Sequence, residues 1–101
     1  MTSLIEILLK LLEHHDVPFK SKTFPRNQFL KDPNTVDTNL YYIELGSVRA
    51  YIIDEDQEHT IRLGYQGNFI AAVDSFITEK SSQLAIQAIK KTKVRVYSKQ
   101  D

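Results

Sequence analysis

Residues 40–53 constrain the fold of this chain more than any other segment. They read LYYIELGSVRAYII. β-Branched and aromatic residues of this kind favour strands, because they pack well on a pleated surface. The run is interrupted at Leu45, Gly46 and Ser47. The segment therefore predicts two strands that meet in a hairpin at Gly46.

Shorter segments of similar character precede and follow this pair of strands. A polar loop over residues 54–58 follows the pair, and turn residues separate the other segments. The last two strands are predicted to pair with each other across the loop 90–93. Many short strands between turns indicate a mainly β fold, an antiparallel sandwich or barrel. The further predicted strands lie over residues 19–24, 29–30, 60–63, 84–89 and 94–97.

The N-terminal segment predicts a helix. Ser3 and Glu6 form a capping box, and the apolar residues that follow extend a helix over residues 4–14. Its polar stripe is narrow, so the apolar surface either wedges against the sheet or meets a partner outside these residues. We assign residues 1–16 to this helix and residues 17–101 to the β domain.

Composition limits the classes of protein to which the chain can belong. Its 101 residues suit one domain. Thirteen basic residues balance 13 acidic ones, so no net charge drives the chain onto nucleic acid or an anionic membrane. The absence of cysteine excludes disulfides and thiolate chemistry. The apolar N-terminus is too short and too charged to span a bilayer and lacks the features of a signal peptide, which predicts a cytoplasmic protein.

The order of motifs resembles the cyclic nucleotide-binding domain of Crp/Fnr-type transcription regulators. The resemblance is carried by the YYI-x-x-GSV pattern at residues 41–48 and by GNFIAA at residues 67–72. It implies an antiparallel jelly-roll β-barrel, also called a double-stranded β-helix, with a short N-terminal helix. In that family a dimerisation helix and a DNA-binding helix-turn-helix follow the barrel. Neither is present in these residues, so the chain is either a free-standing barrel or a fragment of a longer regulator. We expect the fragment, from a regulator that dimerises and binds DNA through those segments.

The resemblance also implies where a ligand would bind. The family places a phosphate-binding cassette at GNFIAA and a phosphate-binding arginine about ten residues later. Here Ala71 matches a glycine of the cassette, Ala72 matches the ribose-binding glutamate, and Ser82 matches the arginine. The pocket positions transferred in this way are Gly67, Asn68, Phe69, Ala71, Ala72, Val73, Ser81, Ser82 and Gln83.

These replacements predict that cyclic AMP and cyclic GMP bind weakly or not at all. A hydrogen bond to a charged group contributes about 1.5–3 kcal/mol. Losing two such contacts weakens binding about a hundred- to ten-thousand-fold. The phosphate would also enter a pocket whose lining is expected to carry no charge.

The sequence thus predicts an effector-sensing regulatory domain in which cyclic nucleotide binding has been lost or altered. The small residues leave room for an uncharged effector, or Phe69, Phe76 and Ile77 fill the space. In the second case the domain is a structural or dimerisation module without a ligand. A divergent cyclic nucleotide-binding domain is the remaining alternative.

Other constellations do not predict chemistry. His14 and His15 point in different directions on a helix, and His59 lies far from them, so no metal site is expected. The acidic loop 54–58 lacks the glycine and the final glutamate of a calcium loop. No G-x-S-x-G motif is present, and we expect no enzyme activity. The basic residues Lys90, Lys91, Lys93 and Arg95 are predicted to form a solvated turn.

Overall fold

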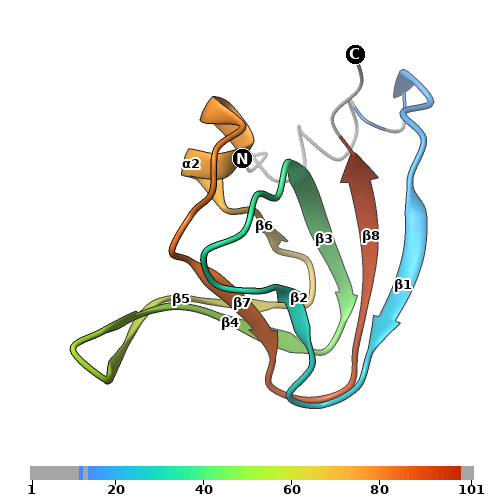
Figure 1. Cartoon of the computed structure of the whole chain (residues 1–101). Coiled ribbons are helices and arrows are strands. Elements are labelled where there is room, and N and C mark those ends of the chain that lie inside the picture. The colour runs from blue at the N-terminus through green and yellow to red at the C-terminus, as the bar shows by residue number, and fades with distance from the viewer. Residues whose placement is uncertain (1–11, 13, 99–101) are drawn as a thin grey trace, which may run out of the picture.

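The computed structural model describes residue 12 and residues 14–98. Residues 17–98 contain eight strands, which form two sheets, and one short helix (Figure 1). The elements, in chain order, are β1 (Lys20–Phe24), β2 (Phe29–Lys31), β3 (Asn39–Leu45), β4 (Ser47–Asp54), β5 (Gln57–Tyr65), β6 (Phe69–Ile70), α2 (Val73–Thr78), β7 (Ala85–Ala88) and β8 (Thr92–Ser98).

The two sheets each have four antiparallel strands. One has the order β1-β8-β3-β6 and the other has the order β2-β7-β4-β5. The mainly β antiparallel prediction is therefore confirmed, but the closed barrel is wrong for the described residues. Closure would require the edge strands of one sheet to pair along those of the other. Two of the edge strands, β2 and β6, have only three and two residues, which is too short for that.

The predicted hairpin at Gly46 is also wrong. β3 pairs with β6 and β8, whereas β4 pairs with β5 and β7, so the chain passes from one sheet to the other at Gly46. The φ angle of Gly46 is 101°, a conformation that favours glycine. A Cβ atom there would lie 2.5 Å from Thr92 Oγ1 and 2.6 Å from the Lys91 carbonyl oxygen. One residue is too short for a hairpin turn, and it forms a sharp corner instead.

A second passage between the sheets lies beside this corner. β7 belongs to one sheet and β8 to the other, so the predicted pairing of residues 84–89 with 94–97 is wrong. Thr92 is fully buried where β8 begins. Its hydroxyl donates to the Lys90 carbonyl (2.7 Å), lies 3.0 Å from the Ser47 carbonyl and accepts from the Ser47 N–H (3.2 Å). These contacts hold the two passages together.

The core lies between the two sheets. Alternate residues of the strands face the core, such as Tyr41 and Ile43 of β3 and Val94 and Val96 of β8. The segments predicted to be strands from the sequence are strands in the structure. Full burial of a valine or isoleucine side chain contributes about 1.5–3 kcal/mol to stability. The cluster consists of Tyr41, Ile43, Val48, Ala50, Ile70, Ile86, Val94 and Val96.

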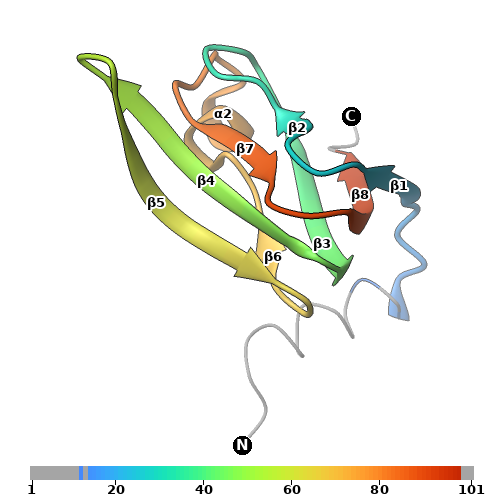
Figure 2. The same ribbon diagram turned by 90° about the horizontal axis from the view of Figure 1, so that it is seen from below.

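The β4–β5 hairpin extends beyond the other strands in both views (Figures 1 and 2). Its turn consists of Glu55 and Asp56, both with positive φ, and the pairing reaches Asp54 and Gln57. The polar loop predicted over residues 54–58 is thus mostly strand. On one face of the hairpin, Arg49 forms an ion pair with Glu58 at 2.7 Å.

The predicted N-terminal helix over residues 4–14 lies largely outside the described residues. Leu12 and His14 have helical backbone, and the Val17 N–H donates to the Leu12 carbonyl at 3.0 Å. The assignment of residues 1–16 and 17–101 to two units stays a prediction. None of the helices in the described ranges is long and apolar enough to cross a membrane.

We predict that the fold depends on the absence of a side chain at Gly46. Gly46→Ala should lower the free energy of unfolding by about 2–5 kcal/mol, because the methyl group meets backbone and Thr92 in a left-handed conformation. Gly67→Ala is the matched control, since Gly67 also has positive φ but open space around it. It should cost only about 1–2 kcal/mol. Urea unfolding followed by circular dichroism measures both, and equal losses would contradict the prediction.

Candidate ligand pocket

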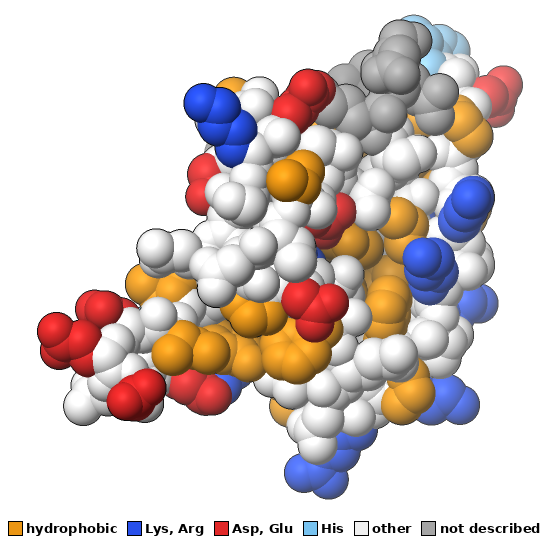
Figure 3. All heavy atoms as spheres, viewed as in Figure 1, with side chains coloured by type: hydrophobic (Ala, Val, Ile, Leu, Met, Phe, Trp, Pro, Cys, Tyr) orange, Lys and Arg blue, Asp and Glu red, His pale blue; other side chains and the backbone are white. Residues whose placement is uncertain are grey.

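A pocket of about 400 Å³ lies between the β4–β5 hairpin and α2. This volume is within the range of small-molecule sites. Figure 3 shows hydrophobic side chains gathered over β4 and β5, below the part of the surface formed by α2. The lining consists of Ala50, Ile52, Ile61, Arg62, Ile70, Ala71, Val73, Asp74, Ser82, Gln83 and Leu84.

A β-bulge shapes the β5 side of the pocket. Arg62 pairs with Ala50 and Thr60 pairs with Tyr51, which leaves Ile61 as an extra residue in β5. A bulge redirects the side chains next to it. As a result, the consecutive residues Ile61 and Arg62 both line the pocket.

Two charged side chains line the pocket, so the expectation of an uncharged lining is wrong. Arg62 comes from β5, and Asp74 comes from the first turn of α2. Both side chains are exposed. Asp74 Oδ1 accepts a hydrogen bond from the Ser75 N–H at 2.9 Å. Among the described residues, neither charge forms an ion pair.

Four of the nine positions transferred from the resemblance line this pocket. They are Ala71, Val73, Ser82 and Gln83. Ala72 is fully buried at the start of α2, and Ser81 is exposed outside the lining.

The other three transferred positions shape the turn between β5 and β6. Gly67 has positive φ, and Asn68 Oδ1 accepts from the Tyr65 N–H at 2.9 Å. The ring of Phe69 packs against that of Tyr42, with centroids 4.9 Å apart. These three residues do not line the pocket.

Lys31 holds the pocket segment that carries Ser82 and Leu84. It is only 3% exposed. Its ammonium donates to the carbonyls of Leu84 (2.6 Å), Asp32 (2.9 Å) and Ser82 (3.0 Å). Burial lowers the pKa of Lys31, and the nearby carboxylates of Asp37 and Asp74 oppose that shift. All three ammonium protons have acceptors, so Lys31 is not available to a ligand.

A second buried network fixes α2 against the sheet. The Asp37 N–H donates to the hydroxyl of Ser75, a fully buried residue of α2, at 2.8 Å. The Tyr41 hydroxyl donates to Asp37 Oδ2 at 2.7 Å, and the Asn39 N–H donates to Oδ1 at 3.1 Å. β2 and the loop that follows it therefore contact both sides of the pocket, β2 through Lys31 and the loop through Asp37.

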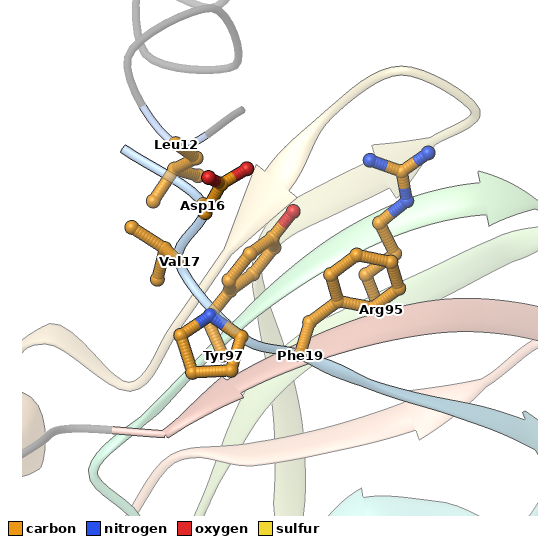
Figure 4. A pocket seen from close by; sticks show the side chains of 7 residues that line it. Leu12, Asp16, Val17, Phe19, Arg95 and Tyr97 are labelled. Carbon is orange, nitrogen blue, oxygen red and sulfur yellow. The ribbon is translucent and has the colours of Figure 1, made fainter. Parts of the chain in front are cut away.

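A larger hollow of about 520 Å³ lies beside β1 and β8 (Figure 4). Here Arg95 lies against the ring of Phe19, 4.9 Å from its centroid, and its Nε donates to Glu44 Oε1 at 2.9 Å. The Phe19 and Tyr97 rings are 5.5 Å apart. Arg95 is thus a half-buried residue of β8 that stacks against Phe19. The prediction that it lies in a solvated turn is wrong. Because its charge is neutralised by Glu44, this hollow is the weaker candidate for a ligand.

Comparisons with known proteins establish the fold. No protein-family model and no curated protein matches the sequence. The solved structures include the catabolite activator protein of Thermus thermophilus, with a TM-score of 0.75 and 18% identity over 95% of this chain. This chain has the fold of a cyclic nucleotide-binding domain. The fold implied by the resemblance is therefore confirmed in its two antiparallel sheets, but not in the closure of a barrel.

Two further solved structures carry this cyclic nucleotide-binding fold. The CO-dependent transcription factor CooA of Carboxydothermus hydrogenoformans matches 90% of this chain, with a TM-score of 0.68 and 24% identity. The regulatory subunit of a cAMP-independent protein kinase A from Trypanosoma brucei matches 79%, with a TM-score of 0.69 and 16% identity. The chain spans 44% of the Thermus protein, 40% of CooA and 28% of the Trypanosoma protein.

The sequence did not lead us to predict the positions of Arg62, Lys31 and Asp74 around the pocket. An arginine was sought only after the GNFIAA cassette, whereas Arg62 precedes it and reaches the pocket through a bulge. A three-residue strand such as β2 gives no periodicity from which to infer that Lys31 is buried. Asp74 lines the pocket because α2 begins at Val73 and places Asp74 in its first turn, and the sequence alone does not fix where α2 begins.

We predict that Lys31 keeps the pocket segment ordered. Lys31→Met preserves the length of the side chain but removes the ammonium from three carbonyls, of which that of Ser82 keeps another donor, the Asn34 N–H at 2.8 Å. The free energy of unfolding should therefore fall by about 1–3 kcal/mol. Backbone amides of residues 82–84 should exchange faster with solvent. Lys22→Met, an exposed lysine on β1, is the control and should change neither quantity. Unchanged exchange in Lys31→Met would contradict the assigned role.

We predict that Tyr41 contributes to stability only below the alkaline range. Burial raises the pKa of Tyr41 above its usual value of 10.0, with the hydrogen bond to Asp37 acting in the same direction. The unfolded chain therefore releases this proton first, and the stability present below pH 10.0 is lost as the pH rises further.

Tyr41→Phe tests this dependence. At neutral pH it should lower the free energy of unfolding by about 1–3 kcal/mol, because Asp37 Oδ2 loses its donor. Above pH 10.0 the variant should lose stability less steeply than the wild type. Urea unfolding across the alkaline range provides the comparison, and parallel curves would rule the assignment out.

Proposed function

We propose that this chain is the effector-sensing domain of a Crp/Fnr-like transcription regulator. The observation that carries the proposal is the pocket beside α2, which combines an apolar floor with two charged side chains at its rim. The similar structures give support, because they include a catabolite activator protein and a CO-dependent transcription factor. In this proposal, dimerisation and DNA binding belong to a dimerisation helix and a helix-turn-helix outside these 101 residues.

The proposed effector is not a cyclic nucleotide. Ala72 and Ser82 provide no carboxylate for a ribose and no guanidinium for a phosphate. Asp74 occupies the first turn of α2, where its negative charge would repel a phosphate. Arg62 lies on β5, so a phosphate bound to it would be oriented differently from one held in the cassette. The similar fold of a cAMP-independent kinase subunit supports a sensor of this kind.

A ligand in this pocket would act on α2 and on residues 82–84. Both segments line the pocket, and both are bonded to the loop between β2 and β3, residues 82–84 through the backbone of Ser82 and α2 through the hydroxyl of Ser75. A ligand shifts a conformational equilibrium only by its difference in affinity for the two states. We propose that occupancy changes the position of α2 relative to this loop, and that the change is passed to the rest of the regulator.

A structural module without a ligand is the second candidate. It is favoured by the exposed side chains of Val73 and Ile77, which are 61% and 69% accessible on α2. Such a module would use α2 as a contact surface and leave the pocket empty. The two proposals differ in whether any small molecule stabilises the isolated domain.

We predict that calorimetry detects no tight binding of cyclic AMP or cyclic GMP, whereas a thermal-shift screen of metabolites finds an effector of another class. Ala71→Phe, which fills the pocket, should abolish the shift, and Ile77→Phe on the exposed side of α2 should leave it intact. A dissociation constant for cyclic AMP in the low micromolar range would contradict the loss of nucleotide binding. A screen in which no compound shifts the transition would favour the structural module.

A further inference from the structure

The two charges at the pocket have opposite sign and come from different elements. Arg62 belongs to β5 and Asp74 to α2, and both line the same hollow. They form no ion pair with each other within 4.0 Å among the described residues. The same pocket is also lined by apolar side chains, its apolar floor, which include Ala50, Ile52 and Ile70.

Arg62 contrasts with the other arginine of the same hairpin. Arg49 donates to Glu58 Oε1 at 2.7 Å and to Thr60 Oγ1 at 2.8 Å, and its guanidinium lies 4.1 Å from the ring centroid of Tyr51. The side chain of Arg62 makes no hydrogen bond or ion pair with the described residues. Its guanidinium therefore keeps all five donors for a ligand carboxylate.

Asp74 shows the complementary pattern on the opposite rim. One carboxylate oxygen accepts from the Ser75 N–H, and the other makes no bond with the described residues. The buried carboxylate of Asp37, in comparison, is bonded through both oxygens. Asp74 thus retains an acceptor for a ligand cation.

We infer that the effector is a small zwitterion with an apolar body, such as an aliphatic amino acid whose carboxylate meets Arg62 and whose ammonium meets Asp74. This inference rests on the proposed ligand-sensing function. An anion without a cationic group would bring its negative charge close to that of Asp74, which is unfavourable. A cation without an anionic group would likewise bring its positive charge close to that of Arg62. An uncharged apolar ligand would cover both charges without pairing them, which carries a desolvation penalty. A zwitterion satisfies both charges and the apolar floor.

The first experiment titrates the isotope-labelled domain with simple probes and follows backbone amide resonances by NMR, which detects weak binding. ω-Amino acids from β-alanine to ε-aminocaproate vary the separation of the two charges, and leucine places them on one carbon. Caproate and hexylamine each lack one charge of ε-aminocaproate. Saturable shifts at Ala71, Val73 and Gln83 are expected with at least one zwitterion and not with the two singly charged analogues.

The second experiment changes the charges of the protein. Arg62→Gln and Asp74→Asn should each weaken binding about fivefold, the upper range for exposed charge pairs. Arg49→Gln, on a saturated arginine of the same hairpin, is the matched control and should leave binding unchanged. Arg62→Glu and Asp74→Lys should each abolish binding, and the double variant should restore it for ω-amino acids, since these can bind in the reverse direction.

The outcomes separate this inference from the proposed function. Saturable binding of an uncharged or singly charged compound at the same amides, unaffected by Arg62→Gln and Asp74→Asn, would overturn the zwitterion and leave the sensor. If only one of these two variants weakened ligand binding, the zwitterion would also be overturned, because a single charge of the protein would then be enough to bind the ligand. An absence of binding by these probes and by a metabolite library would overturn both.

Discussion

The absence of a side chain at Gly46 is the constraint on which the two-sheet arrangement depends. The chain leaves one sheet and enters the other at this residue, with Thr92 Oγ1 and the Lys91 carbonyl within 2.6 Å of where a Cβ would stand. The same Thr92 begins β8 and bonds to Ser47 at the start of β4. Both passages between the sheets are therefore joined at one point. β3 and β4, and likewise β7 and β8, are thereby placed in different sheets, and the apolar side chains of both sheets close on a common core.

The pocket follows from what this arrangement leaves unfilled near α2. β6 has only two residues, so the sheet that contains it ends early on that side, while the β4–β5 hairpin of the other sheet continues. Most residues that line the space between are small or aliphatic, and none of the lining residues is aromatic. Lys31 and the Asp37–Ser75 contact keep the surrounding segments in place. Rigid walls around an open apolar space are the usual basis of a small-molecule site.

The sequence predicts which segments are strands much better than it predicts which strands pair. The alternation of apolar and polar residues along a strand shows which residues share a face. For that reason β3 and β8 could be predicted as strands. Pairing depends on contacts far along the chain, such as Thr92 with Ser47, which have no local signature. A corner and a hairpin at Gly46 both require glycine, so the residue alone cannot distinguish them. The position of Arg62 was missed for a related reason, because a bulge in β5 redirects it.

The charged residues around the pocket fall into two groups that differ in how completely their bonds are made. Lys31 and Asp37 are buried and bonded through every ammonium proton and both carboxylate oxygens, so a ligand has nothing to gain from them. Arg62 and Asp74 are exposed at the rim, with donors and an acceptor left over. Buried charges need hydrogen-bond or ionic partners within the protein for the domain to fold, whereas exposed charges are hydrated and can exchange water for a ligand. The first pair therefore sets the shape of the pocket, and only the second pair is available to select what enters it.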